Sequence, residues 1–193
     1  PEAEEADPGG MEEVLGAVRG HESPAEPEDK AASQLLRTRV LFKSWLLRRP
    51  ELLRSRTLAP GQMEDALRGC AVELPGLLKL PPDALRLEDV RVHGSLPWRR
   101  ALFLTHFFFD LAAVSLRRGK DKAGGLWAVR LEADQDGGVL LRLREEPPAL
   151  LRKLKMDPED KGPLAWLARR ILRHGGMLAV DSGEGIALSV KLP

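Results

Sequence analysis

Two strongly polar side chains, His106 and Asp110, interrupt the most apolar stretch of the sequence. That stretch, residues 97–116, reads PWRRALFLTHFFFDLAAVSL and predicts a helix that is buried on nearly every side. His106 and Asp110 are four residues apart, so they share one face of this helix, one turn apart. Because charged residues divide the run, its clean apolar stretches are too short to cross a membrane. The polar face therefore lines a site or meets a partner.

A second candidate for chemistry is His21, which precedes the acidic residue Glu22. A phospho-accepting histidine next to an acid is a device of signalling kinases, where it lies inside a long helix. Here Pro24 and Pro27 end any helix that reaches His21. His21 is therefore a weak phospho-acceptor candidate, and a histidine in a solvated loop is the simpler interpretation.

Composition and charge set the class of protein. The 193 residues, 43% of them apolar, support one domain, or one domain and an appendage. A single cysteine, Cys70, excludes an internal disulfide, and no signal peptide opens the chain, so we expect a cytoplasmic protein. Residues 1–30 carry ten acidic and two basic side chains, a net charge of −8. The remainder carries 28 basic and 19 acidic side chains, a net charge of +9.

The N-terminal part divides into two segments. Residues 1–29 are acidic and contain prolines and glycines, which predicts a largely disordered segment. Residues 30–58 predict a helical segment with one broad apolar side and one basic side. The apolar side is wider than a short helix can cover alone, so we expect it to pack on another helix, from a second copy of the chain. The residues expected in that interface are Leu36, Val40 and Leu47.

The remaining pattern predicts alternating helices and strands. Helices are expected at residues 61–74, 97–116 and 163–174, and short strands at residues 77–80 and 87–93. Two hairpins are expected, one from strands 126–133 and 139–144 and one from strands 177–180 and 186–192. Hairpins with helices on one face form a two-layer α/β sandwich. Four side chains are expected to be buried between its layers: Phe103, Phe107, Leu111 and Trp166.

The end of the chain, residues 169–193, resembles the end of the ATP-binding domain of sensor histidine kinases. In that family a helix ends in His-Gly-Gly, a strand and a glycine-containing turn follow, and the last strand ends in proline. His174, Gly175, Gly176 and Pro193 occupy these places. The helix at residues 97–116 resembles the N-box helix of the same ATPase superfamily, which includes gyrase, heat-shock chaperones and mismatch-repair proteins. The resemblance covers residues 60–193 and implies a Bergerat-type α/β sandwich with a site for ATP and Mg²⁺.

The motifs that bind nucleotide in this family are altered here. Asp110 falls where the N-box asparagine holds magnesium, and His106 falls where an earlier asparagine stands. The Asp-x-Gly-x-Gly box is replaced by residues 145–149, EEPPA, in which Glu146, or Glu145 before it, stands for the acid that meets adenine. Of the glycine-rich box before the last helix only Gly162 is left. Because glycine amides cradle phosphate, the resemblance implies a vestigial nucleotide site at His106, Asp110, Glu146 and Gly162.

We therefore expect a two-component-type signalling protein with a degenerate histidine-kinase-like domain, acting by protein–protein contacts without ATP turnover. On this interpretation no cofactor binds, the chain forms a homodimer, and its partner is a response regulator or a kinase. Two alternatives remain open. One is a divergent but active histidine kinase, ATPase or histidine phosphotransferase that binds ATP, with Mg²⁺ on Asp110, because aspartate is a competent magnesium ligand. The other is a nucleic-acid-binding regulator that uses the basic helix at residues 37–56.

Overall fold

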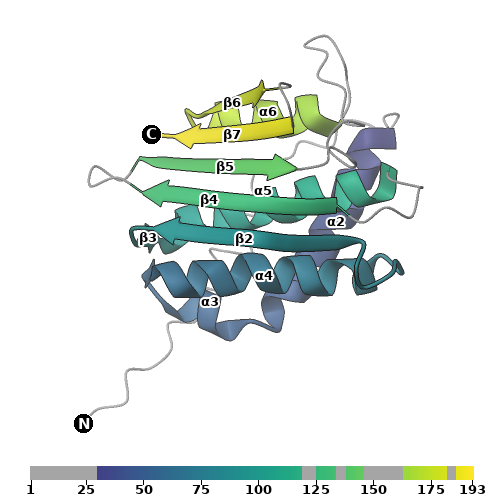
Figure 1. Cartoon of the computed structure of the whole chain (residues 1–193), viewed down its shortest axis with the longest axis horizontal. Coiled ribbons are helices and arrows are strands. Elements are labelled where there is room, and N and C mark those ends of the chain that lie inside the picture. Colours follow the sequence, from purple (N-terminus) through teal and green to yellow (C-terminus); the bar gives the residue numbers. More distant parts are fainter. Residues whose placement is uncertain (1–29, 119–124, 134–137, 146–162, 182–185) are drawn as a thin grey trace.

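A computed structural model of the chain describes residues 30–118, 125–133, 138–145, 163–181 and 186–193 (Figure 1). The acidic segment 1–29 with His21, and the candidate residues Glu146 and Gly162, lie outside the described residues.

The described helices follow the sequence pattern closely. They are α2 (Lys30–Leu47), α3 (Pro50–Arg54), α4 (Pro60–Leu77), α5 (Trp98–Arg118) and α6 (Pro163–Arg173). Prolines stand at the first position of α3, α4 and α6, where the missing N–H group costs no hydrogen bond. Gly175, with a φ of 73°, allows the chain to turn sharply after α6. No helix in these ranges is long and apolar enough to span a bilayer.

Five strands form one mixed sheet. They are β2 (Leu85–His93), β4 (Gly125–Ala133), β5 (Val139–Glu145), β6 (Met177–Asp181) and β7 (Ile186–Leu192), in the spatial order β2-β4-β5-β7-β6. The pair β2–β4 is parallel, with α5 as its crossover, and the other pairs are antiparallel. A two-stranded sheet pairs β1 (Thr57–Leu58) with β3 (Leu96–Pro97). Both predicted hairpins are confirmed.

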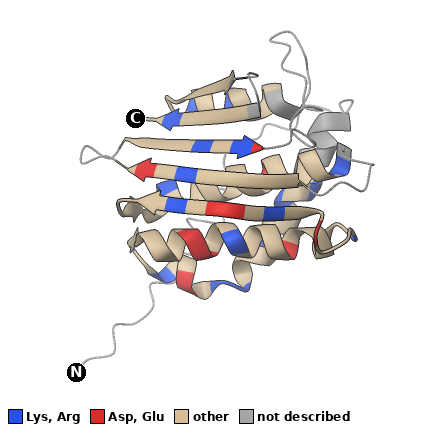
Figure 2. Ribbon diagram, viewed as in Figure 1, with Lys and Arg blue, Asp and Glu red and all other residues tan. Residues whose placement is uncertain are grey.

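Helices cover one face of the large sheet, and no described helix or strand lies on the other, which is called the open face below (Figure 1). Alternate strand residues point to the covered side, where they are buried. The open face carries lysines and arginines on β2, β4, β5 and β7, with fewer acidic residues between them (Figure 2). The predicted two-layer α/β sandwich is thus confirmed, with α2 added on the outside of α5.

Helix α5 lies at the centre of the core, as its composition predicts. On its sheet side, the Phe108 ring meets Trp127 of β4 edge-on, with centroids 5.8 Å apart. On its other side, Phe109 contacts Phe42 of α2 at 5.3 Å. Phe107 and Leu111, which we expected to be buried, are 1% and 0% exposed.

Two of the expected core residues, Phe103 and Trp166, are only half-buried, so that part of the prediction is wrong. Both rings lie against the guanidinium group of Arg170, at centroid distances of 5.3 and 5.9 Å. The Arg170 side chain is itself 17% exposed, so these two rings lie at the border of the helix layer and not between the layers.

The predicted strand at residues 77–80 is also wrong. Helix α4 continues to Leu77, and the next residues form a tight turn at its end. The N–H groups of Leu78 and Leu80 donate to the oxygens of Leu74 and Pro75, at 3.0 and 2.9 Å. These N–H groups complete the helix end and are unavailable to a sheet.

Helix α2 packs on α5 of its own chain through Phe42, Trp45 and Leu46, which are all buried. Leu36, Val40 and Leu47 lie on the exposed side of α2, with 57%, 66% and 55% of their surface accessible. Their predicted contact with a second copy therefore stays a prediction, and the surface it needs is present on the single chain.

Candidate functional site

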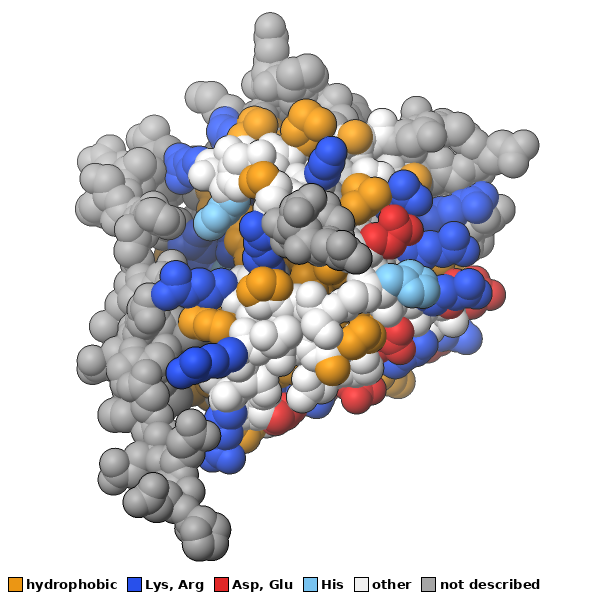
Figure 3. All heavy atoms as spheres, turned by 90° about the vertical axis from the view of Figure 1, so that its left-hand side faces the viewer, with side chains coloured by type: hydrophobic (Ala, Val, Ile, Leu, Met, Phe, Trp, Pro, Cys, Tyr) orange, Lys and Arg blue, Asp and Glu red, His pale blue; other side chains and the backbone are white. Residues whose placement is uncertain are grey.

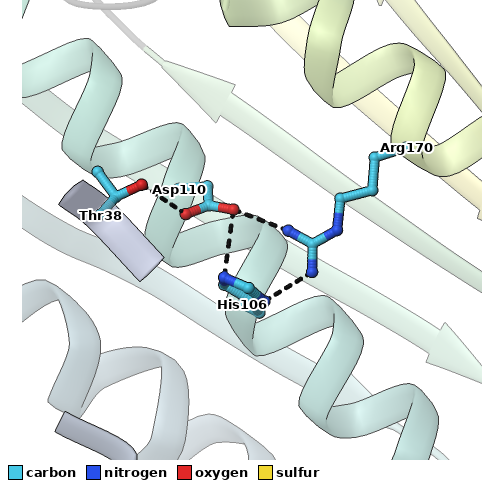
Figure 4. A network of polar contacts seen from close by, with 4 residues as sticks. All are labelled: Thr38, His106, Asp110 and Arg170. Carbon is cyan, nitrogen blue, oxygen red and sulfur yellow. Dashed lines mark hydrogen bonds and ion pairs between the residues drawn. The ribbon is translucent and has the colours of Figure 1, made fainter. Parts of the chain in front are cut away.

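His106 and Asp110 meet two further residues in one buried polar network (Figure 4). Thr38 Oγ1 of α2 donates to Asp110 Oδ1 at 2.9 Å. Arg170 of α6 donates through Nη1 to Asp110 Oδ2 at 2.8 Å and through Nη2 to His106 Nδ1 at 2.6 Å. Three helices thus converge on one carboxylate, and the polar face of α5 meets partners from within the chain.

The amphipathic character of α2 and α6 explains why Thr38 and Arg170 lie next to α5. In α6, Leu167 and Ile171 are fully buried, and Arg170 lies at the border of that apolar stripe, with its side chain 17% exposed. In α2, Thr38 lies one turn before the buried Phe42, on the face that packs against α5. Thr38 is itself 0% exposed. The polar network is therefore built into the helix–helix contacts of the core.

Aromatic rings enclose the network. The His106 ring stacks on Phe42 with a centroid distance of 4.2 Å and an interplanar angle of 5°. Two guanidinium groups lie over the Trp166 ring of α6, that of Arg39 at 5.1 Å and that of Arg170 at 5.9 Å from its centroid. Cation–π contacts of this kind favour the close approach of α2 and α6.

Burial shifts the protonation of both α5 residues. Burial raises the pKa of Asp110 to about 6, although Arg170 and the hydrogen bond from Thr38 act in the opposite direction. Burial, with the charges of Arg170 and Arg39, holds the pKa of His106 well below its ordinary value. The guanidinium donates to Nδ1, so the neutral imidazole carries its proton on Nε2, which lies 3.4 Å from Asp110 Oδ2.

The arrangement does not fit a magnesium ion on Asp110. Both carboxylate oxygens accept hydrogen bonds, and the residue has no exposed surface. Magnesium prefers an octahedral set of oxygen ligands and keeps several waters. Across the described ranges, no group of three or more histidine, cysteine, aspartate or glutamate residues could share a metal ion. To reach a hydrated metal, Asp110 would first have to lose its contacts with α2 and α6.

The acid that could replace the adenine-binding aspartate is also engaged. Glu145, the last residue of β5, is 0% exposed and accepts a hydrogen bond of 3.0 Å from Trp127 Nε1. This bond joins neighbouring strands of the sheet. The other candidate acid, Glu146, and the glycine Gly162 belong to the part of the chain that is not described.

Sequence reasoning found the two α5 residues and missed their partners. The sequence pattern assigns no role to Arg170 or to Thr38. The hydrogen bonds to Asp110 join residues 72 and 60 positions apart in the chain. A threonine in the middle of the apolar side of α2 was the one signal available.

Comparison with solved structures identifies the fold. The histidine kinase domain of a blue-light activated histidine kinase from Erythrobacter litoralis matches with a TM-score of 0.52 and 15% identity, over 97% of this chain and 94% of that chain. The histidine kinase AdeS of Acinetobacter baumannii matches with a TM-score of 0.47 and 14% identity, over 95% and 92% of the two chains. No protein-family model and no curated protein sequence matches the chain. At 15% identity, the likeness to the Erythrobacter litoralis domain shows the fold alone.

Proposed function

We propose that this chain, which has the fold of a histidine kinase ATP-binding domain, is a two-component-type signalling protein with a degenerate nucleotide site. It acts through contacts with other proteins and does not turn over ATP. The observation that carries the proposal is the engaged state of Asp110, whose two oxygens are bonded to Thr38 and Arg170.

The cost of opening this network supports weak nucleotide binding. Binding of Mg²⁺ at Asp110 would exchange two hydrogen bonds, both of them to a charged group, for metal coordination. Hydrogen bonds to charged groups contribute about 1.5–3 kcal/mol each. Losing both would weaken an otherwise ordinary affinity by a factor of at least about one hundred. The departures of residues 145–149 from the family's glycine box act in the same direction.

The exposed side of α2 supports action through protein contacts. Leu36, Val40 and Leu47 are each more than half exposed and, by their spacing, share one side of α2. Exposed apolar side chains that group together mark an interaction site. We assign this surface, called the α2 face below, to contact with a second copy of the chain, which makes a homodimer. The signalling partner of the homodimer would be a response regulator or another kinase.

The nucleic-acid alternative has less support, because several cations of the basic helix have partners within the chain. Arg39 lies over the Trp166 ring, and Arg48 and Arg49 both form ion pairs with Glu73 of α4. Cations held in this way are less available to phosphate groups. The active-kinase alternative requires Asp110 to leave its network, and it becomes the preferred account if ATP is consumed.

Incubation of the full chain with Mg²⁺ and ATP labelled on the γ-phosphate tests the proposal. We expect phosphate release no faster than in buffer, and no acid-labile label on His21 or any other histidine. Circular dichroism of the same sample verifies that the protein is folded. Labelled protein or steady phosphate release, reduced by Asp110→Asn, would overturn the proposal in favour of the active enzyme.

A further inference from the structure

The open face of the large sheet carries like charges at directly opposite positions. In the strand register, Arg91 of β2 lies opposite Arg130 of β4, and Arg130 lies opposite Arg142 of β5. All three side chains are exposed, and they are called the arginine row below. Arg144 lies two residues further along β5, on the same face. Like charges that lie opposite each other on neighbouring strands are destabilising, so a negatively charged cover would stabilise this face.

Acidic residues of the open face compensate the arginine row only in part. Asp89 Oδ1 accepts a hydrogen bond of 3.0 Å from Arg91 Nε, and Glu132 Oε1 lies 3.8 Å from Arg142 Nη1. Arg130, in the middle of the row, forms no ion pair within the described ranges. The described strand residues of this face include more basic than acidic side chains: Arg86, Arg91, Arg130, Arg142, Arg144 and Lys191 against Glu88, Asp89 and Glu132. In Figure 3 several basic side chains lie together along the right-hand border, where the open face is seen edge-on, with fewer acidic ones among them.

The chain itself contains a segment of the opposite charge. Residues 1–30 carry a net charge of −8, and residues 2–13 hold six acidic and no basic side chains. The 29 residues before α2 can span at most about 95 Å, whereas a domain of this size has a radius of gyration of about 16 Å. The acidic segment is therefore long enough to reach the open face from the start of α2. Its attachment to the same chain gives it an effective concentration of about a millimolar, which favours it over a free polyanion.

We propose that residues 2–13 dock on the open face of their own chain, with their carboxylates over Arg130, Arg142 and Arg144. The contact is electrostatic and lies on an exposed surface, so salt screens it and it is reversible. While it is formed, it shields the open face from other polyanions. The docking leaves the α2 face free and does not depend on the proposed function.

Zero-length cross-linking with a carbodiimide tests this contact, because the reagent joins a carboxylate to an amine only when the two groups touch. Arg142→Lys keeps the positive charge and supplies the amine, and Arg68→Lys, at an exposed position on α4, is the matched control. In the full chain at low salt, we expect residues 2–13 to couple to position 142 at least tenfold more than to position 68. The coupling should disappear at about 1 M salt, where the Debye length is about 3 Å. Equal coupling at the two positions would overturn the proposal.

The same reaction on a mixture of unlabelled and isotope-labelled chains shows which chain supplies the bound segment. We expect mass spectrometry to find the cross-linked peptides within single chains, either both labelled or both unlabelled. Cross-links that join a labelled to an unlabelled chain in the proportion of random mixing would assign the occupant to a second copy, and the proposal would be wrong.

Binding of a fluorescent polyaspartate peptide to the full chain measures the shielding. The neutralised variant carries Glu2→Gln, Glu4→Gln, Glu5→Gln, Asp7→Asn, Glu12→Gln and Glu13→Gln. At low salt we expect it to bind the peptide at least tenfold more tightly than the wild type, because the arginine row is then uncovered.

Two pairs of substitutions with the same change in net charge locate the site of this binding. Arg130→Gln with Arg142→Gln, added to the neutralised variant, should remove the gain in affinity. Arg54→Gln with Arg68→Gln, both exposed and away from the sheet, should leave most of it. An unchanged affinity in the neutralised variant, or equal losses from the two pairs, would overturn the docking of residues 2–13 and leave the α2 contact and the proposed function standing.

Discussion

Replacement of Asp110 by asparagine should change how the stability of the protein depends on pH. Asparagine has nearly the same shape and keeps an oxygen that accepts from Thr38, but it cannot ionise. In the folded protein the pKa of Asp110 is about 6, because the carboxyl group is buried. In the unfolded chain an aspartate has a pKa of about 3.9.

The direction of the effect follows from these two values. Because the folded-state pKa of Asp110 is the higher one, its contribution to stability is fully present below pH ~4 and is lost as the pH rises through ~6. A difference of about two pKa units corresponds to about 3 kcal/mol in total. Of this, about 2 kcal/mol should be lost between pH 4.5 and pH 7.5. The pKa of His106 is lowered in the folded protein, so the contribution of His106 to stability falls as the pH drops. This fall should be the same in the wild type and in Asp110→Asn, so it cancels in the difference between them.

Urea unfolding of both proteins at several pH values between 4.5 and 7.5 measures the effect. Trp45 and Trp127 are fully buried, so tryptophan fluorescence reports the transition. The free energy of unfolding of the wild type, minus that of Asp110→Asn, should fall by about 2 kcal/mol over this range. A flat difference, or one that rises with pH, would refute the claim that burial dominates the ionisation of Asp110.

Three further predictions concern the core, the turn between α6 and β6, and the α2 face. Trp127→Phe removes the donor to the buried carboxylate of Glu145, and we expect a loss of about 1–3 kcal/mol in unfolding free energy, measured by urea titration. Gly176→Ala should lower the melting temperature, because a Cβ there would overlap the backbone of β7, whereas Gly61→Ala, with no atom within 4 Å of the new carbon, should be neutral or stabilising. Val40→Lys should reduce self-association at the α2 face in sedimentation velocity, and a wild-type protein that is monomeric at every concentration would contradict that assignment.

Much of the fold was predictable because its signals are local. The apolar run at residues 97–116 specifies α5, and the turn residues between alternating strands specify the hairpins. The failure at residues 77–80 has a local cause too. Leucines beside Pro81 and Pro82 suggest a short strand. In the structure, the N–H groups of Leu78 and Leu80 instead form hydrogen bonds that close the end of α4, and the periodicity of apolar residues does not predict such bonds.

The candidate site was only half predictable because its partners come from distant segments. The pattern of α5 identified His106 and Asp110 as a polar face, but not what that face meets. Whether Asp110 binds an ion or an arginine depends on how α2 and α6 pack over it, and tertiary contacts of this kind leave no periodic signal. The half-burial of Trp166 follows from the same packing, since its ring contacts the guanidinium groups of Arg39 and Arg170 and not the apolar core alone.

Calorimetric titration of the full chain with ATP, in the presence and absence of Mg²⁺, tests the central claim most directly. With Asp110 engaged by Thr38 and Arg170, the account predicts a dissociation constant weaker than about 1 mM, and no gain from Mg²⁺. A dissociation constant in the low micromolar range that depends on Mg²⁺ would contradict it, because the metal would then have displaced the network around Asp110.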